Sequence, residues 1–279
     1  MFVGAHPDDE SFGPGGTLAA YAAAGVRVVY VCATRGEAGT ADPRHLRGFS
    51  TLGDARWAEL ACAAQTLRLA SVIPLGYRDS GMPGAADHEH PRALVRAPLE
   101  DLIRDLVRTI REVQPHVVVT FDPIGGYRHP DHIAVHRATA GAFHAASDAR
   151  RFPGVGPPWA PQRLYYWIPR RGPLRFVVRA LRLFGRDPAR AGRNRDVDLA
   201  DIATVDFPVH ARIRVSRSAV ARKHAALACH RSQITGPFLL RRVLWLLAGG
   251  FPADELFMRA HPAPTAGGAI ERDLFEGMQ

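Results

Sequence analysis

The sequence predicts an α/β fold: a Rossmann-like, mostly parallel sheet with helices on both faces, in a single domain with a C-terminal elaboration. Strand-like β-branched runs alternate with helical patterns through the first half of the chain. These runs are almost entirely apolar, as expected of strands buried on both faces. A chain of 279 residues, 47% apolar and 23% charged, is long enough to build such a core.

The first half of the chain is expected to alternate strands with helices. The expected strands are 2–5, 26–32, 72–75 and 116–121, and the expected helices are 16–25, 54–70, 95–113 and 130–145. The run at 26–32 is the most regular strand candidate, since it is nearly continuous in β-branched residues. In the 95–113 segment, Leu99, Leu102 and Leu106 recur at helical spacing.

The second half is less regular, although no internal repeat or linker marks a second domain within 1–279. The core is expected over about 1–169 and ends with a strand at 164–168. An Arg-rich insertion follows over about 170–205, and a C-terminal helical part covers about 206–279. Within that part we expect a helix at 216–233 and a buried helix at 238–251, whose two arginines and short length argue against a membrane span.

The Arg-rich insertion has the pattern of a basic amphipathic helix over 170–195. Arginines 175, 179, 182 and 186 lie at helical spacing, opposite Phe176, Val177, Leu181 and Phe184. Such a helix can lie on a membrane surface through residues 170–190 or cover a site as a lid. An ordinary solvated helix face is the simpler interpretation, and we do not expect a membrane partner.

The charge and the cysteines bear on partners and compartment. The net charge is +9 and the pI ≈ 10.3, but Lys223 is the only lysine. Because no DNA-binding motif accompanies the arginines, nucleic acid is not expected as a partner. Cys32, Cys62 and Cys229 have the spacing of neither a disulfide framework nor a zinc finger, and no signal-peptide pattern opens the chain. We therefore expect a cytoplasmic protein.

Two polar clusters directly follow predicted strands. The first is His6-Pro7-Asp8-Asp9-Glu10, and the second runs from Asp122 to His132. In open parallel sheets, ligands bind outside the carboxyl ends of the strands, so both clusters are expected at one site. Carboxylates and imidazoles at this density need a counterion, and a divalent metal is the simplest one.

A catalytic zinc site needs three protein ligands and an open position for water. His6 and Asp9 are spaced to converge on one ion, while the adjacent Asp8 is free to act as general base. His132 is expected in the first turn of the 130–145 helix, facing the same cleft. His129 is placed to orient substrate or donate a proton, and the neighbouring Asp131 to anchor a ligand imidazole.

The motifs together resemble the PIG-L/LmbE-type family of zinc-dependent N-deacetylases, which includes mycothiol- and bacillithiol-pathway enzymes and GlcNAc-PI deacetylases. The matching segments are Ala-His-Pro-Asp-Asp-Glu at 5–10, His-Pro-Asp-His at 129–132, Thr34–Gly39, Arg56 with Glu59, Leu75–Met82 and Lys223–Gln233. The resemblance thus spans most of the chain.

The resemblance implies roles for individual residues. It assigns His6, Asp9 and His132 as metal ligands, Asp8 as base, His129 as oxyanion stabiliser or acid, Tyr127 as a neighbour of the substrate carbonyl, and Arg56, Asp79 and Glu37 to the sugar. It implies Zn²⁺, with Fe²⁺ as the alternative in vivo, a small N-acetyl amino-sugar substrate and a homo-oligomer.

The sequence departs from the family pattern in two places. Arg128 occupies a position that is often glycine, where it either attracts an anionic substrate group or points outwards. The first strand is unusually short, which leaves open a start upstream of Met1.

The leading hypothesis is a zinc-dependent hydrolase that removes an acetyl group from an N-acetylglucosamine-type amide. The closest alternative is an amidase acting on a thiol conjugate. Two histidines and a carboxylate are also the ligand set of non-haem Fe(II) oxygenases, although a base at Asp8 has no use there. An arginine-driven binding protein is the third alternative.

Overall fold

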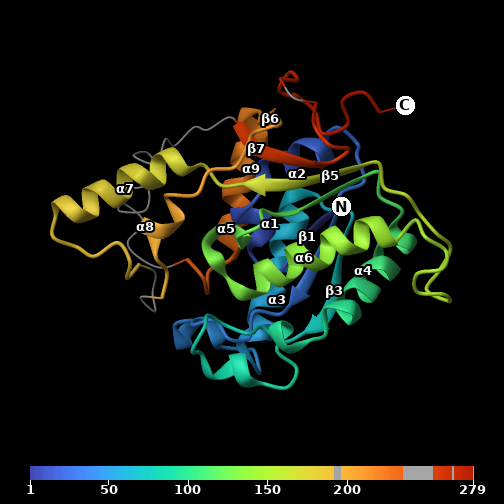
Figure 1. The fold of residues 1–279 in the computed structure, drawn as a ribbon. Coiled ribbons are helices and arrows are strands. Elements are labelled where there is room, and N and C mark those ends of the chain that lie inside the picture. The colour runs from blue at the N-terminus through green and yellow to red at the C-terminus, as the bar shows by residue number, and fades with distance from the viewer. Residues whose placement is uncertain (192–195, 235–253, 266, 279) are drawn as a thin grey trace.

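The computed structural model describes residues 1–191, 196–234, 254–265 and 267–278, which form a seven-stranded sheet with helices on both faces (Figure 1). The strands are β1 Phe2–Gly4, β2 Val29–Thr34, β3 Ser71–Tyr77, β4 Val117–Phe121, β5 Arg163–Ile168, β6 Ala211–Arg214 and β7 Asp254–His261. Their spatial order is β3-β2-β1-β4-β5-β7-β6. All pairs from β3 to β5 are parallel, while β7 runs antiparallel to β5 and β6, so the predicted fold class is confirmed.

The central strands are apolar throughout because helices cover both of their faces. Phe2 and Tyr30 pack on one side of the sheet, and the next residues, Val3 and Val31, pack on the other. Helices α4 (Leu99–Val113) and α6 (Pro130–Ala145) supply the core on the Val3 side. Helices α2 (Gly15–Ala23), α3 (Leu52–Leu67) and α9 (Arg217–Cys229) cover the opposite side.

The helices and strands expected in the first half of the chain are confirmed, with small shifts at their ends. Several further helical segments are short: α1 Asp9–Phe12, α5 Gly125–Arg128, α8 Leu199–Ile202, and the 3₁₀ turns η1 Pro43–Leu46, η2 Ala86–Glu89 and η3 Leu94–Arg96. Helices α1 and α5 matter most, since they carry residues of the two polar clusters.

The C-terminal part differs from the expected helical region. Helix α9 lies within the predicted 216–233, but β6 and β7 add two strands to the sheet. The inward positions of β7 include Phe257 and also Glu255, whose buried carboxylate accepts the backbone N–H groups of Gly16 and Thr17. A buried acid interrupts the apolar alternation by which a strand is recognised. The helix expected at 238–251 lies outside the described residues.

The Arg-rich insertion forms a shorter helix than expected. Helix α7 (Arg171–Leu183) ends before Gly185, whose φ of 66° belongs to the left-handed region that suits glycine after a helix. Residues 192–195 lie outside the described ones. Helices α7 and α8 pack together at one side of the molecule (Figure 1). Among the described residues, no helix is long and apolar enough to cross a membrane.

The cysteines also differ from expectation. The sequence spacing argued against a disulfide, yet Cys62 and Cys229 are bonded, and the buried Cys32 is free. The two bonded residues are 167 positions apart, and the packing of α3 against α9 brings them together. Local spacing carries no information about such a long-range contact.

Candidate metal centre and active site

The two polar clusters meet at the carboxyl ends of β1 and β4, which are neighbours in the sheet. His6 follows β1, and His132 lies in the first turn of α6, which follows β4. Their rings are 5.1 Å apart between centroids. The chain reaches this point through α5, where a Cβ on Gly125 would lie 2.7 Å from the Cβ of His132. Only glycine permits that approach, so the sequence Gly-Gly before Tyr127 has a clear physical role.

His6 is held by carboxylates on one ring nitrogen. Its Nε2 lies 3.1 Å from Asp131 Oδ2 and 3.4 Å from Asp79 Oδ1, so this nitrogen carries a proton. Its Nδ1 faces His132 Nε2 at 3.1 Å. Asp131 is expected to anchor the imidazole of a metal ligand, and its contact with His6 Nε2 has the geometry for that role.

His132 presents a bare nitrogen to the same point. Its Nδ1 lies 3.1 Å from the carbonyl oxygen of Gly125 and must donate to it, which leaves a lone pair on Nε2. Two lone pairs of neutral His6 and His132 would then face each other at 3.1 Å. A positive charge must lie between them, supplied either by a proton on His6 or by a metal ion. The surrounding carboxylates raise the pKa of His6 well above its usual range although burial opposes this, so a metal must displace that proton.

Asp9 lies beside these two imidazoles, where the third ligand is expected. Its Oδ1 is 3.4 Å from His132 Nε2, and its Oδ2 is 3.9 Å from His6 Nδ1. Zinc–ligand bonds of about 2.0–2.2 Å in tetrahedral geometry place ligand atoms about 3.3–3.6 Å apart. The separations of His132 Nε2 from His6 Nδ1 and from Asp9 Oδ1 are close to this range, while Asp9 Oδ2 lies farther from His6. Asp9 Oδ2 also accepts the backbone N–H groups of Ala5 and His6, which fixes its orientation. The donor set therefore fits a divalent metal.

Asp8 lies beside this set and points elsewhere. Its Oδ2 lies 3.1 Å from the Arg56 guanidinium. Burial raises the pKa of Asp8 to about 6, against the opposing effect of Arg56. A carboxylate with a pKa near neutrality, adjacent to a metal ligand and free of the ligand set, suits a general base.

His129 faces the ligand set as a neutral imidazole. Its Nδ1 accepts the N–H of Asp131, so the neutral ring carries its proton on Nε2. Burial, and then the nearby His6 and His132, lower the pKa of His129 well below its usual range. Its ligand atom lies within 4.8 Å of those of His6 and His132. Of the two roles expected for His129, this environment favours the hydrogen-bond donor over the acid.

Tyr127 lies at the mouth of the site. It is 38% exposed, with its ring 5.7 Å from that of His129 and 5.0 Å from that of His132. The next residue, Arg128, pairs with Asp201 of α8 on the surface. Arg128 thus points outwards, the second of the two alternatives considered for it.

The residues expected to contact sugar are mostly engaged with the protein. Arg56 is buried and donates to the carbonyl oxygens of Gly36 and Pro7. The Asp79 carboxylate accepts from Gly81 and faces His6, and these contacts lower the pKa of Asp79 although burial opposes them. Glu37 accepts the backbone N–H of Asp79. The geometry shows these side chains fixing the loops around the site.

Two buried ion pairs near the site were not predicted. Arg171 of α7 contacts Asp122 Oδ2 at 3.3 Å and donates to the carbonyl oxygen of Gly126. His230 Nε2 lies 2.7 Å from Glu10 Oε1. The family resemblance places His230 in the matching segment 223–233 but assigns it no role. Nothing in the local sequence pattern distinguishes Arg171 from the neighbouring arginines.

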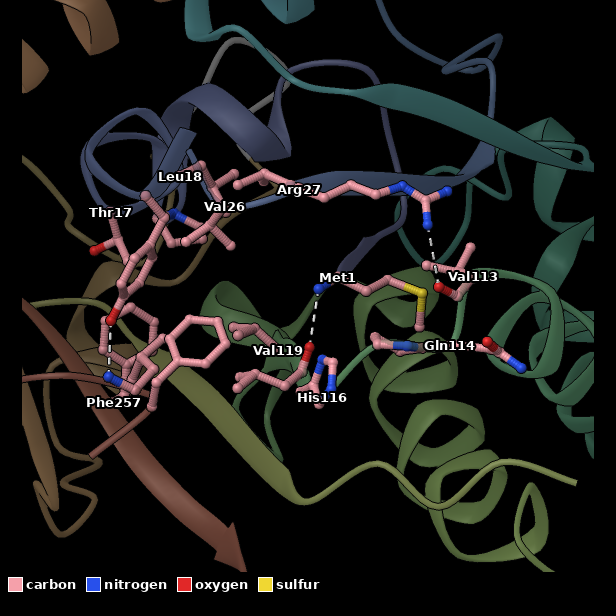
Figure 2. Close-up of a pocket in the computed structure, with 17 residues that line it drawn as sticks. Met1, Thr17, Leu18, Val26, Arg27, Val113, Gln114, His116, Val119 and Phe257 are labelled. Atoms are coloured by element: carbon pink, nitrogen blue, oxygen red, sulfur yellow. Dashed lines mark hydrogen bonds between the residues drawn. The ribbon is translucent and has the colours of Figure 1, made fainter. Parts of the chain in front are cut away.

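An apolar cavity of about 330 Å³ lies at the opposite ends of the central strands (Figure 2). Its lining includes Leu18 of α2 and Phe257 of β7, together with Met1, His116 and Val117 at the starting ends of β1 and β4. The ligand set follows the other ends of these strands. This cavity is therefore separate from the site, and its lining includes none of the expected site residues.

Comparison with known proteins places these features in a family. The profile of the PIG-L family, described as GlcNAc-PI de-N-acetylase, matches residues 1–143. A 1D-myo-inositol 2-acetamido-2-deoxy-alpha-D-glucopyranoside deacetylase from Streptomyces scabiei is 37% identical over 100% of this chain and 89% of its own length. A protein of the same name from Thermobispora bispora is 40% identical over 100% of this chain and 98% of its own length.

Solved structures share the fold. N,N'-diacetylchitobiose deacetylase from Pyrococcus horikoshii aligns with a TM-score of 0.62 and 20% identity over 95% of this chain and 86% of its own. The conserved protein TT1542 from Thermus thermophilus aligns with a TM-score of 0.60 and 24% identity over 96% of this chain and 97% of its own. These likenesses support the architecture of the sheet and its helices.

Proposed function

This chain belongs to the PIG-L family of GlcNAc-PI de-N-acetylases, and on that premise we propose that it is a metal-dependent hydrolase of an N-acetylglucosamine-type amide. The observation that carries the proposal is the pair of imidazole nitrogens of His6 and His132, 3.1 Å apart beside the Asp9 carboxylate. That arrangement needs a positive charge between the two nitrogens, which a bound metal ion would supply in place of the His6 proton, and Asp8 lies next to it as a carboxylate that contacts Arg56.

We propose Zn²⁺ as the ion, since two imidazoles and one carboxylate form a common catalytic zinc set, while Fe²⁺ shares the same donors. When bound, zinc would supply Lewis acidity and lower the pKa of a coordinated water to about 7. His6, Asp9 and His132 would hold the ion, with Asp131 and Asp79 orienting the His6 ring.

The chain's own groups account for the proton and charge transfers of amide hydrolysis. Ionised Asp8 accepts a proton from the attacking water and is placed to pass it to the departing amine, giving acetate and a free amino sugar. Neutral His129, with its proton on Nε2, donates a hydrogen bond to the oxyanion that develops on the acetyl carbonyl. Tyr127 at the mouth is placed to contact the same acetyl group.

We propose an inositol glycoside of N-acetylglucosamine as the substrate. Relatives that carry this activity in their names are 37% and 40% identical over the whole of this chain. Arg128 supports a neutral aglycone, because its charge is already paired with Asp201 and is not offered to an anionic group. The cytoplasmic location, the homo-oligomer and the roles of the individual site residues stay predictions.

The test is a substrate panel scored by release of free amine. It contains N-acetylglucosaminyl inositol, N-acetylglucosaminyl malate, an N-acetylglucosaminyl lipid, simple N-acetyl sugars and a thiol conjugate. We expect kcat/KM for the inositol glycoside to exceed the others by at least about tenfold. Preference for the thiol conjugate would move the assignment to an amidase, and oxygen uptake without amine release would contradict hydrolysis.

A further inference from the structure

We propose that Glu10 and His230 form a buried positioning pair that holds Asp8 in place for proton transfer. The proposal rests on the proposed function, because it concerns the base of that reaction. Glu10 lies in α1 directly after Asp8 and Asp9, and His230 directly follows α9. Both residues are 0% exposed, so they lie behind the site and act through their neighbours.

The backbone at Asp8 needs to be held. Its φ of 125° and ψ of −23° lie outside the regions that non-glycine residues normally adopt. Such a conformation persists only where the surrounding contacts determine it, and it is commonly found at functional sites. Here it separates two adjacent side chains: Asp9 turns to His6 and His132, and Asp8 turns to Arg56.

Glu10 supplies one of these contacts directly. Its Oε2 accepts the backbone N–H of Asp8 at 3.0 Å. Its Oε1 accepts from the Ser11 hydroxyl and from His230 Nε2, the latter at 2.7 Å. One oxygen thus fixes Asp8 while the other is fixed by His230. A fully buried carboxylate needs such a partner, since an unpaired charge in this position would be unstable.

His230 is itself fixed against α3. The adjacent Cys229 is bonded to Cys62, and Ser232 donates from both its N–H and its hydroxyl to Glu59, each at 2.7 Å. Helix α3 also carries Arg56, which contacts the Asp8 carboxylate. The base is therefore held twice from one helix, at its carboxylate by Arg56 and at its backbone through His230 and Glu10.

Three variants separate positioning from general structural support. His230→Leu removes the donor to Glu10. His230→Gln replaces the imidazole by an amide whose N–H can restore that contact. Ser232→Ala is the matched control, because it removes one contact of this segment with α3, while the Ser232 N–H bond to Glu59, the disulfide and the Glu10–His230 contact all remain. The readouts are kcat and KM for amine release, bound zinc and thermal unfolding.

We expect kcat to fall about 10- to 100-fold in His230→Leu, the range for a small displacement of a catalytic group, while KM and bound zinc stay near wild type. His230→Gln should recover kcat to within a few-fold of wild type, and Ser232→Ala should keep it there. Equal kcat losses in His230→Leu and Ser232→Ala, or no recovery in His230→Gln, would overturn the proposal.

Glu10→Gln keeps the assay informative if His230→Leu does not fold. The Gln side chain has the volume of the carboxylate, but its NH₂ group must face either the Asp8 N–H or His230 Nε2, both of which are donors. We therefore expect kcat to fall again with KM unchanged. A wild-type chain that is inactive on every substrate would contradict the proposed function instead. The positioning pair would then be judged by a crystal structure of His230→Leu, in which Asp8 must leave its positive φ.

Discussion

The parallel and antiparallel parts of the sheet contribute different kinds of residue to the site. The parallel part, β3-β2-β1-β4-β5, carries the proposed metal ligands and Asp8 at its strand ends. The C-terminal addition, with α7, α9 and β7, contributes buried charged groups that contact the segments following β1 and β4. Arg171 contacts Asp122, His230 contacts Glu10 of α1, and Glu255 contacts the first turn of α2.

The proposed catalytic residues and the residues that support them have different sequence signals. The proposed ligands and base come from short, local motifs, because adjacent strand ends need only a few residues to converge. Their supports come from residues 49 to 239 positions away, as with Arg171 on Asp122, His230 on Glu10 and Glu255 on Gly16. Variants in the first group should abolish turnover, and those in the second should weaken it by degrees.

The largest effect is expected for Asp8→Asn. This change keeps the shape of the side chain but removes the proton acceptor, so kcat should fall at least about 100-fold while bound metal stays unchanged. Steady-state amine release together with metal analysis checks it. Near-normal turnover would show that another group is the base.

The pH profile should report the same carboxylate. Burial raises the pKa of Asp8 to about 6, and the ionised form is the active one. Activity is therefore present above this pKa and is lost as pH falls, about tenfold per pH unit. A metal ion in the site would lower the pKa further, so the midpoint in kcat/KM should lie at or below about 6. A midpoint above 7 would contradict the role of Asp8.

A smaller effect is expected for Arg171→Leu in the C-terminal addition. It leaves the fully buried Asp122 carboxylate without its cation, and loosens the loop that leads to Tyr127. Loss of one partner of a buried ion pair costs about 3 kcal/mol, so the free energy of unfolding and kcat/KM should both decrease. Arg175→Leu is the control, since its exposed pair with Asp206 should be worth under about 1 kcal/mol. Equal losses of stability and of kcat/KM in the two variants would contradict a special role for the buried Arg171–Asp122 pair.

The smallest effect on turnover is expected from the Cys62–Cys229 bond. A disulfide typically stabilises a protein by about 2–4 kcal/mol, so reduction should lower Tm. Because the two Ser232 bonds to Glu59 still hold the segment that carries His230, kcat should stay within a few-fold of its original value. The Cys62→Ser/Cys229→Ser double variant should unfold at the same temperature with and without reductant. Thiol labelling of protein taken rapidly from cells would show whether the bond forms there, which bears on the expected cytoplasmic location.

The sequence predicted those parts of the molecule that depend on local pattern. Periodicity located α4 and the buried strands. The rule that ligands bind at the carboxyl ends of parallel strands predicted that the clusters around His6 and His132 lie together, and the structure confirms this. The sequence could not predict β7, because Glu255 at an inward position breaks the apolar alternation. Nor could it predict that Arg56 and Asp79 bind loop backbone, since the partners of a buried polar side chain depend on contacts far apart in the chain.

The most direct test of the account is the metal content of four purified proteins, measured by elemental analysis after loading with zinc and removal of excess ion. We predict about one zinc per chain in the wild type and in Asp8→Asn, and at least about tenfold weaker binding in Asp9→Ala and His132→Ala. A His132→Ala protein that keeps its zinc, or an Asp8→Asn protein that loses it, would contradict the assignment of ligands and base.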